Sequence, residues 1–290
     1  MNLTELKTID IEDGVSRGTP FALFRVVHIE QSNNTIQAYH FDRTDFNTSG
    51  SPLAISGGGQ STICKLADNT IAHFDNGNDE LRAYSFDADT GIWSQTGNGF
   101  SISSTGYAAM AYLEDNTIAY VDVINNLLST YSWDGTDFSL VGNALDVSPS
   151  TSLAIGSLTN SLIALFDNTS NELRAYSWDG TDWALIGNQL TISGANEGAI
   201  VGLSTTRIAF IDNGNDDLRA YDWDGTDWTF VADELNIPGI GFPGLAFDGT
   251  YTYFIDSSND DLRAYQFNGT WSQIGNDLNI PGAFPSLAVI

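Results

Sequence analysis

The chain has very few basic residues and a single cysteine. Only 10 of its 290 residues are Lys or Arg, against 37 Asp and Glu, which gives a formal net charge of −27. A surface this acidic repels phosphate backbones, so the composition argues against nucleic-acid binding. The cysteine, Cys64, lies in the apolar run STICKLA. One cysteine excludes an internal disulfide framework, so the fold must be stabilised by its core.

Long apolar runs and targeting signals are also missing. No apolar run approaches the roughly 20 residues that a membrane-spanning helix needs, which predicts no membrane insertion. The N-terminal stretch MNLTELKTIDIEDG has neither the basic start nor the apolar core of a signal peptide. We therefore expect no cleaved leader, and the localisation stays open between a virion surface and an extracellular site. The apolar fraction of 42% is nevertheless sufficient for a substantial core.

A motif of about eleven residues recurs through the chain at nearly constant spacing. It reads LRAYSWDGTDW at 173–183 and LRAYDWDGTDW at 218–228, with shorter or altered copies elsewhere. The tyrosines that mark the six copies are spaced by 45, 47, 45, 45 and 44 residues, and they are Tyr39, Tyr84, Tyr131, Tyr176, Tyr221 and Tyr265. Six copies at one period predict a repeat array.

Each repeat divides into four strand signals. In the fourth copy, runs rich in β-branched, aromatic and aliphatic residues occupy 151–157, 161–167, 172–178 and 183–192. The Asp-Gly pairs at 134–135, 179–180 and 224–225 suit tight hairpins, because glycine tolerates a positive φ. No segment shows a sustained helical period. The chain is therefore predicted to be all-β.

Four antiparallel strands in each of six repeats predict a six-bladed β-propeller. The first repeat has no first strand of its own, whereas the C-terminal residues 284–290 (FPSLAVI) match the first-strand sequence FPGLAF at 242–247. We expect this C-terminal strand to join the N-terminal blade and close the ring, which would protect its edges. The propeller domain would span 20–290. Residues 1–19 would form an N-terminal arm or an extra strand that could attach the protein to other virion or particle proteins.

Two sets of repeated side chains could bind a ligand. An arginine stands two residues before four of the tyrosines, and a tryptophan begins the last strand of several repeats. One interpretation is structural, with ion pairs across a hairpin and packing between blades. The other is a ring of sugar pockets, because sugar hydroxyls take bidentate hydrogen bonds and sugar C–H faces stack on aromatic rings. The candidate ligand-binding residues are Arg82, Arg174, Arg219, Arg263, Trp183, Trp228 and Trp271.

The pattern IAFID…DLRAYDWDGTDWTFVADEL resembles the repeats of six-bladed fungal and bacterial fucose-binding lectins. The resemblance implies several monosaccharide pockets between blades, each built from an arginine, a carboxylate or glutamine, and aromatic residues. It favours a non-enzymatic recognition propeller that binds glycans or a cell-surface receptor, for example as an adhesin, a virion spike or an appendage protein.

Three acidic loops suggest a metal site as a second kind of ligand. The sequences DNGNDE at 75–80, DNGNDD at 212–217 and DSSNDD at 256–261 place many oxygen ligands close together, as Ca²⁺ requires. The same Asn, Asp and Gly clusters are also ordinary turn formers. The candidate Ca²⁺ ligands are Asp75, Asp212, Asp216, Asp256 and Asp260.

Catalytic signals are weak. His28 and His73 occupy a repeat position where later copies carry Tyr, Leu or Phe, which is typical of a packing site. No Ser-His-Asp arrangement, phosphate-binding loop or cysteine nucleophile stands out. The sequence therefore predicts a protein that is not an enzyme. A scaffold propeller that docks another chain is the alternative. A propeller glycosidase, the third candidate, would need an asymmetric cluster of acids in the central channel.

Overall fold

The computed structural model describes residues 24–30, 33–55, 61–102, 106–114, 116–147, 153–231, 234–280 and 283–290. Within these ranges the chain forms strands and turns and no helix, which confirms the all-β prediction. It follows that none of the described segments is a helix long and apolar enough to cross a membrane. The N-terminal arm predicted at 1–19 lies outside the described residues.

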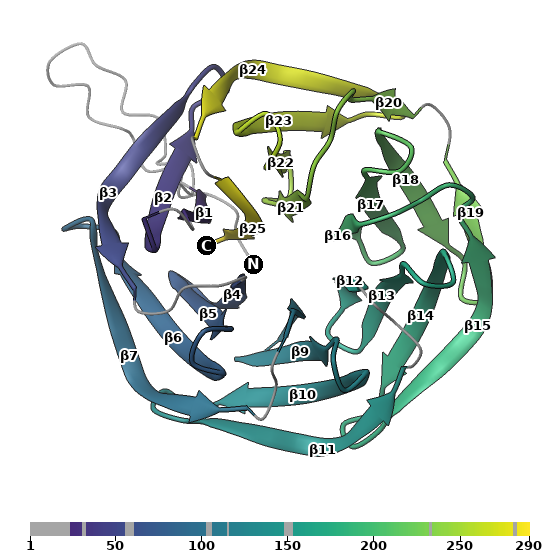
Figure 1. Ribbon diagram of the computed structural model, residues 1–290, viewed down its shortest axis with the longest axis horizontal. Helices are drawn as coiled ribbons and strands as arrows, with labels where there is room; N and C mark the ends of the chain where they lie inside the picture. The colour runs from purple at the N-terminus through teal and green to yellow at the C-terminus, as the bar shows by residue number, and fades with distance from the viewer. Residues whose placement is uncertain are drawn as a thin grey trace, which may run out of the picture.

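Six sheets stand around a central axis as the blades of a propeller (Figure 1). We number the blades in chain order and give their strands from the axis outwards. Blade 1 contains β25 (Ala283–Val289), β1 (Arg25–Glu30), β2 (Thr35–Phe41) and β3 (Phe46–Ala54); blade 2 contains β4 (Thr62–Ala67), β5 (Thr70–Asp75), β6 (Glu80–Asp87) and β7 (Ile92–Ser101); blade 3 contains β8 (Ala108–Glu114), β9 (Thr117–Asp122), β10 (Leu127–Trp133) and β11 (Phe138–Asp146). Blade 4 contains β12 (Leu153–Thr159), β13 (Leu162–Asp167), β14 (Glu172–Trp178) and β15 (Trp183–Thr191); blade 5 contains β16 (Gly198–Ser204), β17 (Arg207–Asp212), β18 (Asp217–Trp223), β19 (Trp228–Phe230) and β20 (Leu235–Asn236); blade 6 contains β21 (Pro243–Phe247), β22 (Thr252–Asp256), β23 (Asp261–Phe267) and β24 (Trp271–Asn279).

The ring closes as the sequence predicted. The C-terminal strand β25 pairs antiparallel with β1, for example through Val27 and Ala288, and supplies the inner strand of blade 1. The first and last segments of the described chain therefore share one sheet. Their pairing ties the two ends of the ring together, so no blade is left incomplete.

The repeated turn residues explain why each repeat folds back on itself. Gly135, Gly180 and Gly225 adopt φ values of 98–101°, which side chains other than glycine rarely tolerate. In the same turns the aspartate before the glycine accepts two backbone hydrogen bonds. Asp179 Oδ1, for instance, accepts from the amides of Thr181 and Asp182, both at 2.8 Å. The turn is thus fixed locally, before any contact between blades is made.

The hydrophobic core lies between the blades. One cluster joins blades 4 and 5 and includes Phe166, Phe210 and Tyr221, all buried. The repeated Leu173 and Leu218 are also fully buried. The Leu-x-x-Tyr part of the motif is therefore core, and it recurs because every blade must present the same face to its neighbour.

A second contact between blades runs around the outer rim. A Gly-Asn pair in the outer strand of one blade meets the Asp-Gly-Thr-Asp turn of the next. The amide of Asn188 donates to the carbonyl oxygen of Thr226 at 2.7 Å, and its side chain donates to Asp227 at 2.9 Å. Equivalent side-chain bonds join Asn98 to Asp137, Asn143 to Asp182 and Asn276 to Asp45. We call this contact the rim clasp.

The glycine of the rim clasp allows this approach. Gly187 has a φ of 62°, and a Cβ atom built on it would collide with the carbonyl oxygen of Thr226. Gly180 also has a positive φ, but a Cβ atom there would meet nothing within 4 Å. We expect Gly187→Ala to lower the free energy of unfolding by about 3–4 kcal/mol, because strain and a backbone collision add up. Chemical denaturation measures the change.

Gly180→Ala is the matched control for the rim clasp. It carries backbone strain without the collision, so we expect a loss of about 1–2 kcal/mol. Equal losses for the two variants would show that the rim clasp contributes nothing beyond the conformational preference of glycine.

Candidate functional site

A central cavity of about 260 Å³ opens where the six inner strands begin. All six strands contribute to its wall, so the cavity lies on the propeller axis. Its apolar lining includes Ile63, Met110, Ile155, Ile200, Leu245 and Leu287. These side chains come from equivalent positions of the inner strands, so every strand gives the wall an apolar residue, and Ser61, Thr62 and Ser286 add hydroxyl groups.

The inner strands also bring backbone polar groups to this cavity. Each of them is the edge strand of its sheet and pairs with one neighbour among the described strands. Edge strands carry backbone amide and carbonyl groups that are not used by the sheet. One such group, the amide of Ile63 in β4, donates to the hydroxyl of Ser286 in β25 at 2.7 Å. The cavity therefore combines an apolar wall with a backbone that can form hydrogen bonds.

One repeat position forms part of the mouth of the cavity. Tyr107, Glu197 and Phe242 each precede an inner strand, and all three line the cavity. In each case the backbone carbonyl accepts a hydrogen bond from the residue that follows the second strand of the same blade. The donors are Val123 (3.1 Å), Asn213 (3.1 Å) and Ser257 (3.4 Å). The three residues are thus structurally equivalent, and blade 5 has a carboxylate where blades 3 and 6 have aromatic rings.

Glu197 is the only carboxylate among the described residues that line the cavity. Its side chain is partly buried, whereas Tyr107 and Phe242 are 50% and 45% exposed. Burial raises the pKa of Glu197 above its ordinary value, and a side-chain hydrogen bond with Asn213 partly opposes the rise. A carboxyl group with a raised pKa in a cavity is a candidate for proton transfer.

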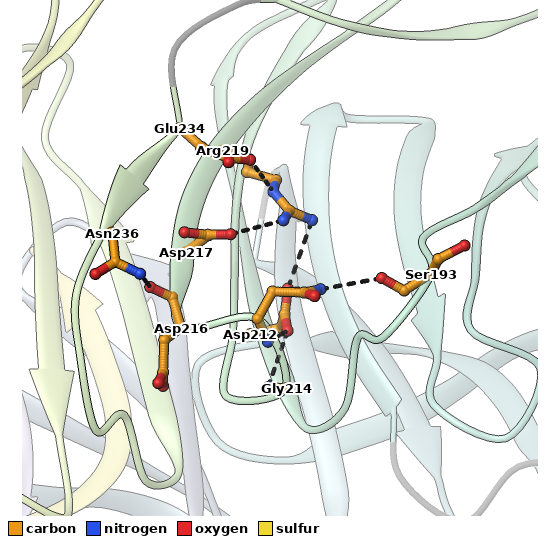
Figure 2. A network of polar contacts seen from close by, with 9 residues as sticks. Ser193, Asp212, Gly214, Asp216, Asp217, Arg219, Glu234 and Asn236 are labelled. Atoms are coloured by element: carbon orange, nitrogen blue, oxygen red, sulfur yellow. Dashed lines mark hydrogen bonds and ion pairs between the residues drawn. The ribbon is translucent and has the colours of Figure 1, made fainter.

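The blade that carries Glu197 has an unusual ion-pair network (Figure 2). Asp212, which precedes Asn213, is fully buried and accepts from the amides of Gly214 and Asn215 at 2.9 and 2.7 Å. Arg219 is 4.0 Å from Asp212, because it bonds to Asp217 at 2.7 Å and to Glu234 at 3.2 Å. Desolvation accordingly raises the pKa of Asp212. The network fixes the turn from which Asn213 contacts Glu197.

The four predicted arginines lie in ion pairs within their own blades, with side chains 12–15% exposed. Arg82 contacts Asp75 at 3.0 Å and Glu80 at 2.8 Å. Arg174 contacts Asp167 at 3.2 Å and Glu172 at 2.6 Å. Arg263 contacts Asp261 at 2.8 Å and Asp277 at 3.4 Å. The structure brings none of these arginines to the central cavity, and their role as ligand-binding residues stays a prediction.

The three predicted tryptophans lie inside the molecule. Trp183, Trp228 and Trp271 are 4–7% exposed and begin the outer strands of their blades. The indole of Trp183 donates to the hydroxyl of Thr130 in the preceding blade at 2.8 Å. Each ring also packs on the aromatic residue that ends the preceding strand, which is Trp178, Trp223 or Phe267. They too lie away from the described cavity lining.

The predicted calcium ligands are placed in turns. Asp75 accepts from the amide of Gly77 at 3.0 Å and from the side chain of Asn78 at 2.8 Å, and Asp256 makes the same bonds to Ser258 and Asn259. Asp216 accepts from the amide of Ile240 at 3.0 Å, and both Asp216 and Asp260 have a φ of 56°. The described residues include no group of three or more His, Cys, Asp or Glu that could hold a metal. The single carboxylate of the central cavity also falls short of the six to eight oxygen ligands of Ca²⁺.

Two other expectations concern catalysis. His73 is fully buried, neither of its ring nitrogens has a hydrogen-bond partner, and burial lowers its pKa to about 4. It is an uncharged packing residue, as its repeat position indicated. A glycosidase requires a pair of carboxyl groups across the scissile bond. The described lining has one carboxylate and does not provide that pair.

The sequence contains a signal for Glu197 that lies outside the recurring motif. Tyr107, Ser152, Glu197 and Phe242 are spaced at intervals of 45 residues, which is the repeat period itself. The residue type varies along this series, and Glu197 is its one charged member.

No family model and no curated protein sequence matches this chain. Its fold, in contrast, is similar to that of many solved structures. A protein from Bacteroides uniformis proposed to be a 6-phosphogluconolactonase has 14% identity and a TM-score of 0.66, over 92% of this chain and 99% of that one. The periplasmic gluconolactonase of Pseudomonas aeruginosa has 13% identity and a TM-score of 0.63, over 93% and 99%. A chain of a nidogen/laminin complex has 12% identity and a TM-score of 0.64, over 92% and 98%.

These comparisons confirm the six-bladed propeller and correct the functional prediction. At 12–14% identity the likeness itself shows the shared fold. The prediction that the chain is not an enzyme, whether as a recognition module or as a scaffold, is contradicted, because neighbours of this fold carry lactonase names. A lectin, an adhesin and a virion spike gain no support. The motifs that suggested sugar pockets are used inside the blades, whereas the candidate site lies on the axis. The chain is thus a six-bladed β-propeller whose described central cavity contains one carboxylate.

Proposed function

We propose that this protein is a hydrolase that opens a cyclic ester, a lactone, in the central cavity. The observation that carries the proposal is Glu197, the one carboxylate in the described lining of the central cavity. Its raised pKa fits a general base, which works best when its pKa lies near the working pH. The lactonase names of structures with the same fold support the choice of substrate class.

In the proposed reaction, the Glu197 carboxylate takes a proton from a water molecule. The resulting hydroxide attacks the carbonyl carbon of the lactone, and negative charge develops on the carbonyl oxygen. The bond between the carbonyl carbon and the ring oxygen then breaks, and the ring oxygen receives the proton from the Glu197 carboxyl group. The product is a hydroxy acid, and Glu197 returns to the carboxylate form.

Backbone amides of the inner strands are suited to stabilise the charge that develops on the carbonyl oxygen. They belong to edge strands, and they are fixed by sheets on the other side. Fixed donors stabilise an oxyanion more strongly than water does, because they need no reorganisation. Asn213 would act as a positioning residue, because its backbone and side chain both contact Glu197.

The pH dependence of lactone hydrolysis tests this proposal. Glu197 is a base only when it is ionised, so activity should rise with pH through its pKa. Because burial raises that pKa, the midpoint of the rise in kcat/KM should lie above the ordinary glutamate value of 4.5. Hydrolysis of δ-valerolactone, followed by acid release between pH 4 and 7, measures the midpoint while the uncatalysed reaction is slow.

The variant Asn213→Ala provides a second test of the pKa of the Glu197 carboxyl group. The variant removes a hydrogen bond that lowers the pKa of Glu197, so the midpoint should move to higher pH. A wild-type profile that is flat over this range, or a midpoint that stays in place in Asn213→Ala, would speak against Glu197 as the base.

A further inference from the structure

The described residues that line the cavity include no positively charged side chain. Among the described residues that line it, the ionisable side chains are Glu197 and Tyr107, and there is no Lys, Arg or His. Phosphate and carboxylate groups are normally bound by arginine, by lysine or by helix N-termini. The described part of the chain offers no helix either. The described lining of the cavity therefore lacks the groups that recognise anionic substrates.

Six basic residues of the described part of the chain are paired with acids and do not line the cavity. Arg82, Arg174, Arg219 and Arg263 are paired with carboxylates of their own blades. Lys65 pairs with Asp68 at 3.1 Å, and Arg207 pairs with Asp222 at 2.6 Å. To reach a bound anion, one of these side chains would have to leave its acid partner. Each of the four arginines has at least one partner acid that is buried or partly buried. None of them is placed to supply the missing charge.

An anionic substrate would meet two electrostatic penalties. It would give up part of its water shell without gaining a counter-ion from the described lining, which is costly for any charge. It would also approach the Glu197 carboxylate, in a chain whose formal net charge is −27. An uncharged lactone pays neither penalty, and its carbonyl group can still bond to the edge-strand backbone.

The size and wall of the cavity restrict the uncharged candidates further. Its volume of about 260 Å³ lies just below the roughly 300–1,000 Å³ of sites for drug-sized ligands. A single ring with a short substituent fits that space better than an oligosaccharide does. The isoleucine, leucine and methionine side chains of the wall give an alkyl substituent apolar surface to pack on, beside the hydroxyl groups of Ser61, Thr62 and Ser286.

We infer that the substrate is an uncharged, single-ring lactone with an apolar substituent, and that phosphorylated and carboxylate-bearing lactones are rejected. This inference rests on the proposed function, since it names the substrate class of the same cavity. It has a consequence for turnover. Ring opening creates a carboxylate beside Glu197, so the product is repelled by the cavity that bound its precursor.

Three δ-lactones of equal ring size test the inference by kcat/KM. They are δ-octalactone, which has an alkyl substituent, glucono-δ-lactone, and 6-phosphoglucono-δ-lactone. We expect kcat/KM to fall in that order, with at least about a 100-fold difference between the first and the last. A kcat/KM for the phosphorylated lactone that equals or exceeds that of δ-octalactone would overturn the inference and leave lactone hydrolysis in place.

Binding of lactams, which are not hydrolysed, separates this inference from the proposed function. Calorimetry would compare 6-propylpiperidin-2-one with 6-oxopiperidine-2-carboxylate on the full-length protein. We expect the uncharged lactam to bind at least about tenfold more tightly, and Glu197→Gln to narrow that preference. Glu114→Gln is the matched control, because Glu114 is exposed at the far end of the inner strand β8.

Each outcome of the lactam experiment decides a separate question. Equal or tighter binding of the carboxylate lactam, or no binding of either lactam, overturns the inference. Preferential binding of the uncharged lactam by a protein that hydrolyses none of the three lactones refutes the proposed function and upholds the ligand class.

Discussion

Arg174→Met is expected to lower the free energy of unfolding by about 3 kcal/mol, because it leaves the charge of Asp167 buried without its cation. Asp167 is fully buried and lies 3.2 Å from Arg174. The amide of Thr169 and the hydroxyl of Ser170, both at 2.9 Å, still donate to it and prevent a larger loss. Methionine keeps most of the volume of the arginine side chain, so the change measured by denaturation is mainly electrostatic.

Two further variants separate charge from packing at this ion pair. In Arg174→Met with Asp167→Asn, the buried charge is gone, so the double variant should lose less than the sum of the two single variants. Arg207→Met is the control for an exposed pair, because Arg207 and Asp222 are 34% and 39% exposed. It should change stability by less than about 1 kcal/mol. Equal effects of Arg174→Met and Arg207→Met would contradict a structural role for the repeated arginine.

Glu197→Gln is expected to lower kcat for lactone hydrolysis by roughly 10²–10⁴-fold, the usual contribution of a general base. Glutamine has the same shape but cannot take a proton from water, so KM should change little. Stopped or continuous acid-release assays at saturating lactone measure kcat directly. A variant that retains more than about a third of the wild-type kcat would eliminate Glu197 as the base.

The stability of Glu197→Gln distinguishes lost chemistry from lost folding. A raised pKa means that the fold favours the protonated form, so the wild-type protein loses stability as pH rises through that pKa. Glutamine resembles the protonated form and avoids this loss. The variant should therefore be at least as stable as the wild type at pH 7. Glu114→Gln, on the same propeller but far along β8, should retain full activity.

The architecture could be predicted from the sequence because each repeat contains the turn residues and core positions that determine its own strands. The Asp-Gly turns and the Leu-x-x-Tyr core positions are visible within one period, and the extra C-terminal strand is found by comparing the first and last repeats. The strands predicted at 172–178 and 183–192 agree closely with β14 and β15. Local turn residues and the periodic pattern of buried residues determine where these strands begin and end. Both can be recognised in the sequence without knowledge of contacts between distant residues.

The contacts between blades could not be predicted in the same way. The rim clasp joins Asn188 to Asp227, which are 39 residues apart. This hydrogen bond can be recognised only when the outer strand is known to contact the turn of the next blade. The repeated arginine was ambiguous for another reason. An arginine close to carboxylates and aromatic rings is expected both in a sugar pocket and in a buried ion pair, and sequence alone cannot measure its burial.

The candidate site was missed because it departs from the repeat. Repeated residues stabilise every blade equally, whereas a reaction needs its groups once, on the axis where the blades converge. Glu197 is the one charged residue in the series that it forms with Tyr107, Ser152 and Phe242. A comparison of the repeats position by position, with attention to changes of charge, would have found it.

A crystal structure of the protein with 6-propylpiperidin-2-one would test the central claim most directly. We predict that the lactam occupies the central cavity, with its carbonyl oxygen bonded to backbone amides of inner strands and a water molecule between its carbonyl carbon and Glu197. A lactam bound between blades or on the rim, with the central cavity filled only by solvent, would contradict the account.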